Sequence, residues 1–277
     1  MSIAPQAFFV KRIVADRASV TVLVGAGQSH HTYEPSPQQV GQLSEARVYF
    51  TLGLPFEEGL VAKVKASCPE LAVIDTSEGI KLRLTTEDEA GGHEEGQAGA
   101  DEAGSPDPHV WLDPELAKIQ SAAIAAELER FDPEGGDEYR KNLAALSADL
   151  DAVDAKLTEV LGPLKGSEVF VYHPAFGYLL DAYGLKQVAV EVSGKEPSAR
   201  QLADLTERAR NEGARVIFVQ PQFPRGPAET IAREIGGVVV PLDPMAEDYI
   251  ANLERMADAI RAGLGTSGSP SPPSPSP

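Results

Sequence analysis

The sequence predicts an α/β protein with two lobes, each a mostly parallel sheet flanked by helices, joined by one long backbone helix. Short apolar segments rich in β-branched residues alternate with helical segments, a pattern typical of βαβ units. The longest helical pattern, at about 137–161, lies between two such blocks. A chain of 277 residues with 42% hydrophobic content is long and apolar enough to form two cores.

The first block opens with Ser2-Ile-Ala-Pro-Gln6, which reads as the end of a strand. We therefore expect the natural leader, and part of that strand, to be absent from this chain. The β-branched run 18–24 predicts a strand, and the glycines and prolines of 25–37 predict a loop. Further elements are expected as helices at 38–45 and 56–65 and strands at 48–52 and 71–74.

Segment 87–107 differs in composition from both blocks. It holds eight acidic residues and no Lys or Arg, so it cannot bury enough apolar surface to offset the entropy of ordering. We expect it to be disordered or highly mobile, either as a solvated linker or as an electrostatic funnel that concentrates cations. His93, inside it, is a candidate for a weak and transient metal ligand.

After the acidic segment, a helix is expected at 114–130, capped by Asp113 and opened by Pro114. The elements that follow are expected as strands at 169–172, 187–191, 216–220 and 238–242 and as helices at 137–161, 176–183, 198–212, 227–235 and 248–264. The predicted domains are an N-terminal lobe 1–134, a linking helix 135–163, a C-terminal lobe 164–265 and a disordered Ser/Pro tail 266–277.

Charge and cysteine content exclude several classes of protein. The formal net charge of −18 opposes binding to nucleic acid or to anionic membranes, and it favours cations. Cys68 is the single cysteine, so neither an intramolecular disulfide nor a cysteine-based zinc site can form. No apolar run has the length of a membrane span.

The five histidines, at 30, 31, 93, 109 and 173, are the most informative residues. His173 directly follows the strand 168–172 and Asp243 follows the strand 238–242, where residues of an open parallel sheet face the ligand crevice. His31 lies in the loop after 18–24, and His109 precedes the capped helix. Each lobe can therefore present two ligand groups to a cleft between the lobes.

Three imidazoles and one carboxylate are a ligand set that suits zinc, because calcium and magnesium prefer oxygen ligands. Taken singly, each residue has an ordinary alternative: a histidine at a strand end can be a surface residue, and Asp243 before Pro244 can start a turn. Adjacent residues in an extended loop point apart, so one of His30 and His31 is expected to face the metal.

Five motifs resemble the zinc/manganese solute-binding proteins of ABC importers, the ZnuA/TroA-like family. They are Ser2-Ile-Ala-Pro-Gln-Ala-Phe-Phe-Val10, Gln28-Ser-His-His-Thr-Tyr-Glu-Pro-Ser-Pro37, Asp107-Pro-His-Val-Trp-Leu-Asp-Pro114, Tyr172-His-Pro-Ala-Phe-Gly-Tyr178 and Leu242-Asp-Pro244. They occur in order over almost the whole chain, about 2–264.

The resemblance implies two α/β lobes with the metal between them. It assigns His31, His109, His173 and Asp243 as metal ligands, and histidine at 173, where manganese-binding relatives tend to carry Glu, favours zinc. Two departures matter: family loops before the second ligand are often richer in histidine, and His30 stands where Pro or an acidic residue is frequent. His30 therefore competes with Asp243 for the fourth position.

The predicted function is extracytoplasmic, high-affinity binding of Zn²⁺ for delivery to the membrane permease of an ABC importer. We expect a periplasmic or otherwise extracytoplasmic monomer that binds no nucleic acid and is not an enzyme. The alternatives are a manganese or other divalent-metal binder of the same family, a zinc-dependent hydrolase and a surface adhesin. A hydrolase needs an open zinc position and a general base, for which Glu34 and Glu196 are the candidates.

Overall fold

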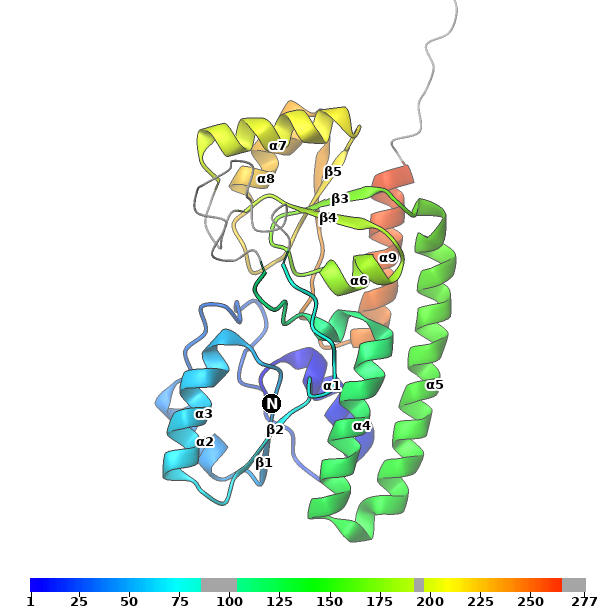
Figure 1. Cartoon of the computed structure of the whole chain (residues 1–277). Coiled ribbons are helices and arrows are strands. Elements are labelled where there is room, and N and C mark those ends of the chain that lie inside the picture. The colour runs from blue at the N-terminus through cyan, green and yellow to red at the C-terminus, as the bar shows by residue number, and fades with distance from the viewer. Residues whose placement is uncertain (86–103, 192–196, 266–277) are drawn as a thin grey trace, which may run out of the picture.

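The computed structural model describes residues 1–85, 104–191 and 197–265, and it confirms the predicted α/β fold. Two parallel sheets lie at opposite ends of the molecule, and a long helix, α5 (Gly136–Leu161), runs beside both (Figure 1). The predicted domain boundaries stay a prediction, although the two sheets give each lobe a framework of its own. No helix in the described ranges is long and apolar enough to cross a membrane.

The N-terminal lobe contains a two-stranded parallel sheet, β1 (Val48–Thr51) and β2 (Ala72–Asp75). Helices α2 (Pro37–Ser44) and α3 (Pro55–Ser67) lie close to the positions that the sequence predicts. Helix α1 (Ala4–Val14) was missed, because Ser2-Ile-Ala-Pro-Gln6 reads as a strand end. The structure shows why a helix forms: Pro5 is tolerated in the first turn, and Phe9, Val10 and Ile13 share a buried face.

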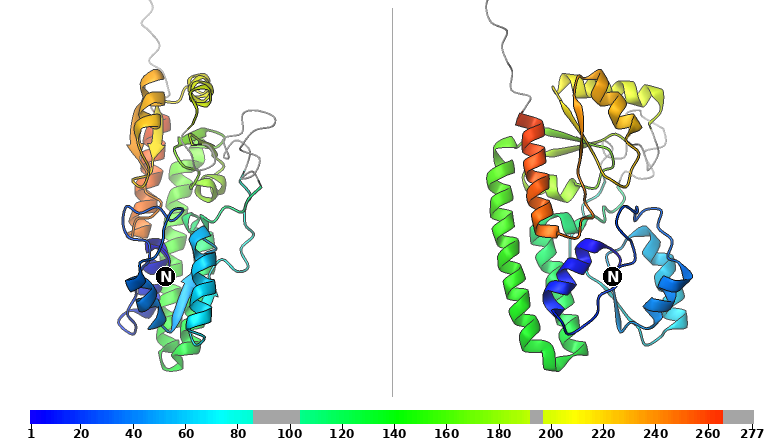
Figure 2. Two further views of the ribbon diagram at one scale, coloured as in Figure 1. Left: turned by 90° about the vertical axis from the view of Figure 1, so that its left-hand side faces the viewer. Right: turned by 180° about the vertical axis from the view of Figure 1, so that it is seen from behind.

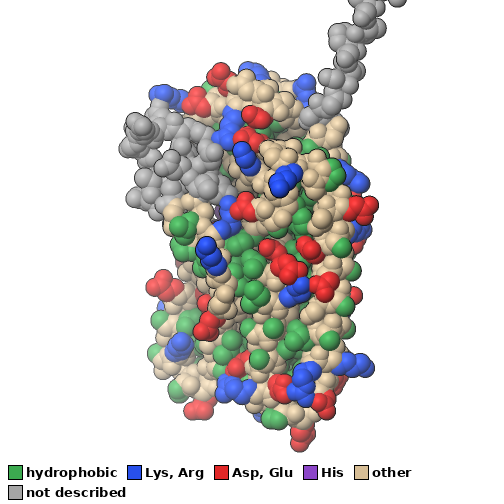
Figure 3. Space-filling model, turned by 45° about the vertical axis from the view of Figure 1, so that its right-hand side comes forward, with side chains coloured by type: hydrophobic (Ala, Val, Ile, Leu, Met, Phe, Trp, Pro, Cys, Tyr) green, Lys and Arg blue, Asp and Glu red, His purple; other side chains and the backbone are tan. Residues whose placement is uncertain are grey.

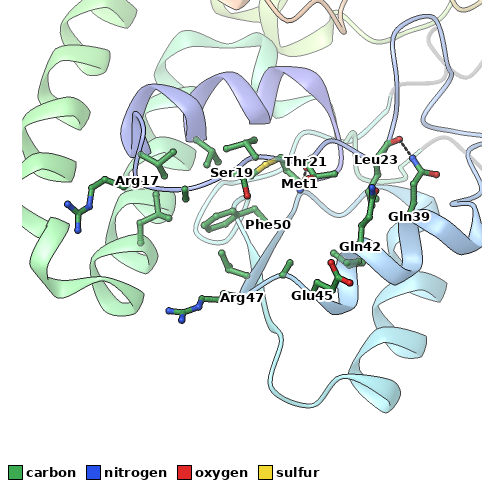
Figure 4. Close-up of a pocket in the computed structure, with 18 residues that line it drawn as sticks. Met1, Arg17, Ser19, Thr21, Leu23, Gln39, Gln42, Glu45, Arg47 and Phe50 are labelled. Atoms are coloured by element: carbon green, nitrogen blue, oxygen red, sulfur yellow. Dashed lines mark hydrogen bonds between the residues drawn. The ribbon is translucent and has the colours of Figure 1, made fainter.

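The predicted strand 18–24 is wrong, since no strand is assigned to it. Its backbone pairs instead with the first two residues, through Leu23 N to Met1 O at 3.0 Å and Val24 N to Ser2 O at 2.9 Å. Between this segment and β1 lies a cavity of about 650 Å³, lined by Val20, Thr21 and Phe50 among others (Figure 4).

The C-terminal lobe is a four-stranded parallel sheet in the order β4-β3-β5-β6. Its strands are β3 (Glu168–Val171), β4 (Lys186–Ala189), β5 (Val216–Val219) and β6 (Val238–Pro241). Its helices, which flank the sheet in Figures 1 and 2, are α6 (Gly177–Ala182), α7 (Ala199–Asn211), α8 (Gly226–Glu234) and α9 (Tyr249–Gly265). All eight elements lie close to their predicted positions.

Helix α5 connects the lobes by packing rather than by chain connection alone. It packs against α1 and α4 (Pro114–Phe131) at one end and against α9 at the other. Its buried positions, including Leu146, Leu150, Val153 and Leu157, form one face. Short 3₁₀ turns adjoin these helices at Val110–Leu112, Pro133–Gly135 and Gly162–Leu164. Because α5 packs against helices of both lobes, it forms a stiff connection between them.

Part of the acidic segment is described, and it corrects the expectation of disorder. Gly104 to Asp107 pair with the chain before the segment, where Leu84 and Pro106 form an antiparallel bridge and Asp107 is 4% exposed. Asp107 is held in place because its carboxylate accepts from His109 and Arg83 and its backbone N donates to Arg83 O. Residues 87–103, with His93, and the predicted tail 266–277 lie outside the described residues.

Candidate metal centre

Four histidines converge between the lobes. His30 and His31 lie in the loop before α2, His109 precedes α4, and His173 directly follows β3. The Nε2 atoms of His31 and His173 are 2.8 Å apart, and those of His30 and His109 are 3.2 Å apart. Candidate ligand atoms of His30, His31 and His109 lie within 4.8 Å of one another. The structure thus brings together three of the four predicted ligands and adds His30.

Both members of the His30-His31 pair belong to the cluster, although adjacent residues in an extended loop were expected to point apart. Their ring centroids are 4.1 Å apart. His30 is the more buried, at 3% exposure, with its ring 5.8 Å from that of Trp111. The loop is therefore folded so that both rings face inward, which residue spacing alone does not reveal.

Two carboxylates orient the histidines that come from different lobes. Asp107 Oδ1 accepts from His109 Nδ1 at 2.6 Å, and Glu191 Oε1 forms a hydrogen bond with His173 Nδ1 at 2.5 Å. The ionised Asp107 fixes a proton on His109 Nδ1, so His109 Nε2 keeps a lone pair directed into the cluster. It follows that His30 donates the Nε2–H···Nε2 hydrogen bond to His109 in the metal-free protein.

Asp107 and Glu191 were not identified from the sequence. Asp107 is two residues from His109, inside the Asp-Pro-His motif, so its proximity was the available signal. Glu191 follows β4, the strand next to β3, and faces His173 because the carboxyl ends of parallel strands lie at one edge. Finding Glu191 required the strand order, which the sequence does not state.

Burial keeps His30, His31 and His173 in their neutral form. Burial lowers the pKa of His30 and of His173 well below the ordinary value, and burial with the neighbouring His173 and His109 lowers the pKa of His31 to about 2. The face drawn in Figure 3 shows no histidine surface. Neutral imidazoles are the form that binds metal, so these three rings need lose no proton from a charged state to bind it.

The pKa values of the two carboxyls are shifted in opposite directions. Burial raises the pKa of Asp107, but the charge of His109 and hydrogen bonds from His109 and Arg83 outweigh burial and hold that pKa below its usual value. Burial raises the pKa of Glu191 to about 8. The Glu191–His173 pair therefore carries no net charge at neutral pH in the metal-free protein.

Asp243 has other partners in this structure. Its Oδ1 accepts from the backbone N of Met245 at 2.9 Å and from Gln222 Nε2 at 3.0 Å. Among the described residues, the three-histidine group of His30, His31 and His109 includes neither Asp243 nor His173, but His173 contacts His31 directly. These contacts match the turn that Asp243-Pro244 suggests, so the assignment of Asp243 as a ligand stays a prediction that the geometry does not favour.

The wall of the site is aromatic on both sides. Phe223 stacks on His173 with ring centroids 4.8 Å apart, and Trp111 lies 5.2 Å from His109. Trp111 in turn donates from Nε1 to Pro244 O at 2.8 Å, which ties the lobes together beside the cluster. Glu34, one candidate base for a hydrolase, is exposed, and Glu196 lies outside the described residues. The cavity of Figure 4 includes none of the histidines.

Fold and site together define a two-lobed α/β binding protein with a buried histidine cluster in the seam between its lobes. The family model described as "Zinc-uptake complex component A periplasmic" matches residues 1–263. The chain belongs to this ZnuA family, as the sequence motifs predict. The family description concerns uptake rather than catalysis, which confirms the prediction that the chain is not an enzyme.

Individual relatives are similar over most of this chain. It is 32% identical over 267 residues to the zinc-binding lipoprotein AdcA of Streptococcus pneumoniae TIGR4, covering 91% of this chain and 53% of the relative. It is 29% identical to the high-affinity zinc uptake system protein ZnuA of Bacillus subtilis 168, covering 94% and 85%. The chain thus spans about half the length of the AdcA lipoprotein and most of the length of the Bacillus protein.

Two solved structures bear on the site. A crystal structure of a ZnuA has a TM-score of 0.86 and 39% identity, covering 95% of this chain and 97% of that one. The solute-binding protein FpvC of Pseudomonas aeruginosa, solved in complex with Mn²⁺, has a TM-score of 0.80 and 27% identity, covering 96% and 98%. A protein solved with Mn²⁺ therefore has a similar fold.

Proposed function

We propose that this chain is an extracytoplasmic zinc-binding protein that captures Zn²⁺ between its lobes and delivers it to the permease of an ABC importer. The observation that carries the proposal is the meeting of four imidazoles from both lobes, three of them buried and that of His31 half-buried, with Nε2 atoms 2.8 and 3.2 Å apart in pairs. Nitrogen donors in this number suit zinc better than magnesium or calcium. The family and the names of the relatives support the same cargo and a periplasmic location.

The proposed ligands are His31, His109 and His173, with His30 in the fourth position. His30 is favoured over Asp243 because its ring already contacts His109, whereas the Asp243 carboxylate holds a turn. Zinc accepts four ligands in tetrahedral geometry at about 2.0–2.1 Å from nitrogen. A small outward shift of the paired rings makes room for the ion, because their Nε2 atoms are closer together than ligands of one zinc ion.

Charge balance supports a four-imidazole site. Neutral rings leave the ion's double positive charge uncompensated, and burying an uncompensated charge is costly. Asp107 and Glu191 lie directly behind His109 and His173, so two carboxylates face the ion through the rings. Zinc binding is then expected to expel the extra proton from the Glu191–His173 pair, since the positive charge of the ion stabilises the ionised carboxylate behind the ring.

Zinc capture is proposed to alter the seam between the lobes only slightly. Helix α5 packs along both lobes, and Trp111 and Tyr249 join them beside the site through a hydrogen bond from Tyr249 Oη to Trp111 O at 2.6 Å. Such packing opposes the wide hinge closure seen in other binding proteins. We infer that the permease recognises a local change around the histidines, and that the chain acts as a monomer.

Manganese is the second candidate cargo, because FpvC of similar fold was solved with Mn²⁺. The donor set argues against it here, since manganese prefers oxygen ligands and four imidazoles offer none. Titration of metal-free protein with Zn²⁺ and with Mn²⁺, each in competition with a chelator, tests the choice. One bound Zn²⁺, and Mn²⁺ weaker by several orders of magnitude, is the expected result. Comparable affinities, or binding unaffected by loss of His173, would contradict the proposal.

A further inference from the structure

A short ribbon joins the ends of the acidic segment and brings Arg83 opposite Asp107. Asp107 N donates to Arg83 O at 3.0 Å, Gly104 N donates to Thr85 O at 2.8 Å, and Leu84 bridges to Pro106. Arg83 and Asp107 are distant in sequence but adjacent across this ribbon. The ribbon therefore places a guanidinium beside the carboxylate that orients His109.

The Arg83 side chain links that carboxylate to the other lobe. Its Nη1 donates to Asp107 Oδ2 at 2.8 Å, while its Nε donates to Asp181 Oδ2 in α6 at 3.0 Å. The second oxygen of Asp107 accepts from His109 Nδ1. The side chains of Arg83 and Asp107 are only 15% and 4% exposed, so water screens this contact weakly.

Helix α6 is shaped to receive Arg83. A Cβ atom on Gly177 would lie 1.8 Å from Arg83 Nη1, so only glycine permits this position of the guanidinium. Tyr178 Oη accepts from Arg83 N at 2.9 Å and donates to Asp107 O at 3.0 Å. One helix turn of the C-terminal lobe thus contacts both sides of the ribbon.

Helix α6 begins shortly after His173, so the contact of Arg83 with α6 affects the positions of both His109 and His173. His109 is fixed through Asp107, and His173 is joined by a short connection to Gly177 and Tyr178. The rings of His109 and His173, from different lobes, have centroids 5.4 Å apart. The contacts of Arg83 with Asp107 and with α6, which we call the Arg83 clasp, therefore set the separation of His109 and His173, the ligands from the two lobes.

We propose that Arg83 is a positioning residue for the metal centre, which holds His109 through Asp107 and holds the ribbon against α6. The inference rests on the proposed zinc-binding function and deepens it. Arg83 need not touch the ion. A lysine provides one point charge, whereas the guanidinium contacts Asp107 and Asp181 at once, so Arg83→Lys is expected to recover only part of the function.

The test compares Arg83→Gln, Arg83→Lys and Arg208→Gln in the full chain. Arg208 is the matched control, because its ion pair with Glu168 is also partly buried but lies within the C-terminal lobe. Zinc affinity is measured by chelator competition, and the visible spectrum of the Co²⁺-loaded protein reports ligand geometry. Arg83→Gln is expected to weaken zinc binding by about tenfold to hundredfold and to change the Co²⁺ spectrum. Arg83→Lys should fall between, and Arg208→Gln should stay within about twofold of wild type.

Two double variants test the route of the effect. Asp107→Asn should remove most of the additional effect of Arg83→Gln, because Arg83 acts on His109 through Asp107. Gly177→Ala should weaken binding in the wild type by displacing the guanidinium, yet cost nothing more in Arg83→Gln. Additive losses in both pairs would overturn the proposed route.

The clasp and the proposed function fail in different ways. Wild-type affinity and an unchanged Co²⁺ spectrum in Arg83→Gln would overturn the clasp while leaving zinc binding intact. If the wild type binds no zinc, the proposed function is wrong. The role of Arg83 is then tested by the ¹⁵N chemical shifts of the His109 ring in the metal-free protein. A His109 Nδ1–H signal that weakens or shifts in Arg83→Gln, but not in Arg208→Gln, supports it. An identical His109 Nδ1–H signal in the wild type, Arg83→Gln and Arg208→Gln overturns the proposed role of Arg83.

Discussion

The two lobes hold their histidines by different means. In the N-terminal lobe, His109 is oriented by Asp107, two residues earlier in the same loop, whereas His30 is buried and the half-buried His31 lies against the rings of His30 and His173. In the C-terminal lobe, His173 is oriented by Glu191, which reaches it from the next strand of the sheet. The carboxylate that orients the N-terminal lobe's histidine is therefore close in sequence, whereas the carboxylate in the C-terminal lobe is brought close by the order of the strands.

This difference has a consequence for how the site responds to change. The N-terminal lobe supplies three rings on loops, whereas the C-terminal lobe supplies one ring at the end of a buried strand. We infer that His173 is the fixed point against which the loop histidines adjust. Removing a ligand, removing a hydrogen-bond partner of a ligand, or changing pH should therefore affect the histidines of the two lobes unequally.

The largest effect is expected from removing one oriented ring of each lobe. His109→Ala and His173→Ala should each weaken zinc binding by more than the roughly tenfold to hundredfold typical of losing an outer hydrogen-bond partner. His173→Ala should be the worse of the two, because the remaining three rings all come from one lobe. Chelator competition at pH 7.5 measures both. Equal, small losses would show that the two lobes do not share one ion.

The next effect separates His30 from Asp243. His30→Ala should weaken zinc binding strongly, since it removes a ring that contacts His109. Asp243→Asn should cost little, because an amide oxygen can still accept from Met245 N and preserve the turn. Asn at 243 is thus a matched control that removes the charge and keeps the shape. A large loss in Asp243→Asn with none in His30→Ala would reverse the assignment of the fourth ligand.

Smaller losses should follow from the carboxylates behind the rings. Asp107→Asn and Glu191→Gln are expected to weaken zinc binding by about tenfold to hundredfold, as loss of such contacts does in other metal sites. Asp107→Asn should cost more, because Asp107 also contacts Arg83. Calorimetry in buffers of different ionisation enthalpy should show proton release on zinc binding near neutral pH in the wild type. That release should decrease in Glu191→Gln, and its persistence would argue against Glu191 as the source.

The sequence predicted most of the fold and three of the four clustered rings, and the exceptions have physical causes. Strand 18–24 failed because its backbone pairs with Met1 and Ser2 rather than with a strand, and helix α1 was missed because its proline suggests an extended chain. His109 and His173 follow from their places beside regular elements. Glu191 and Arg83 do not, because they reach the site across a sheet and across a ribbon.

The smallest effect is a pH dependence of the metal-free protein. The folded-state pKa values of His30, His31 and His173 are lowered, so the unfolded chain binds more protons and the free energy of unfolding falls as pH drops below about 6.5. Each such proton contributes up to about 1.4 kcal/mol per pH unit. Glu191, with its pKa raised to about 8, acts in the opposite direction, and its contribution is lost as pH rises through 8.

Chemical denaturation at pH 7.5, 6.5 and 5.5 measures this balance. Three histidines outweigh one carboxyl below pH 6.5, so wild-type stability should fall there. The fall should be shallower in His31→Asn, which retains a polar side chain but does not titrate. Equal slopes in the two proteins would show that His31 is not held neutral by the fold.

The most direct test of the central claim is a crystal structure of the zinc-loaded protein with anomalous data at the zinc edge. The account predicts one strong peak between the lobes, bonded at about 2.0–2.1 Å to Nε2 of His31, His109, His173 and His30. Asp107 and Glu191 should still contact the Nδ1 atoms of His109 and His173. Zinc bound elsewhere, with the rings still hydrogen-bonded to each other, would contradict it.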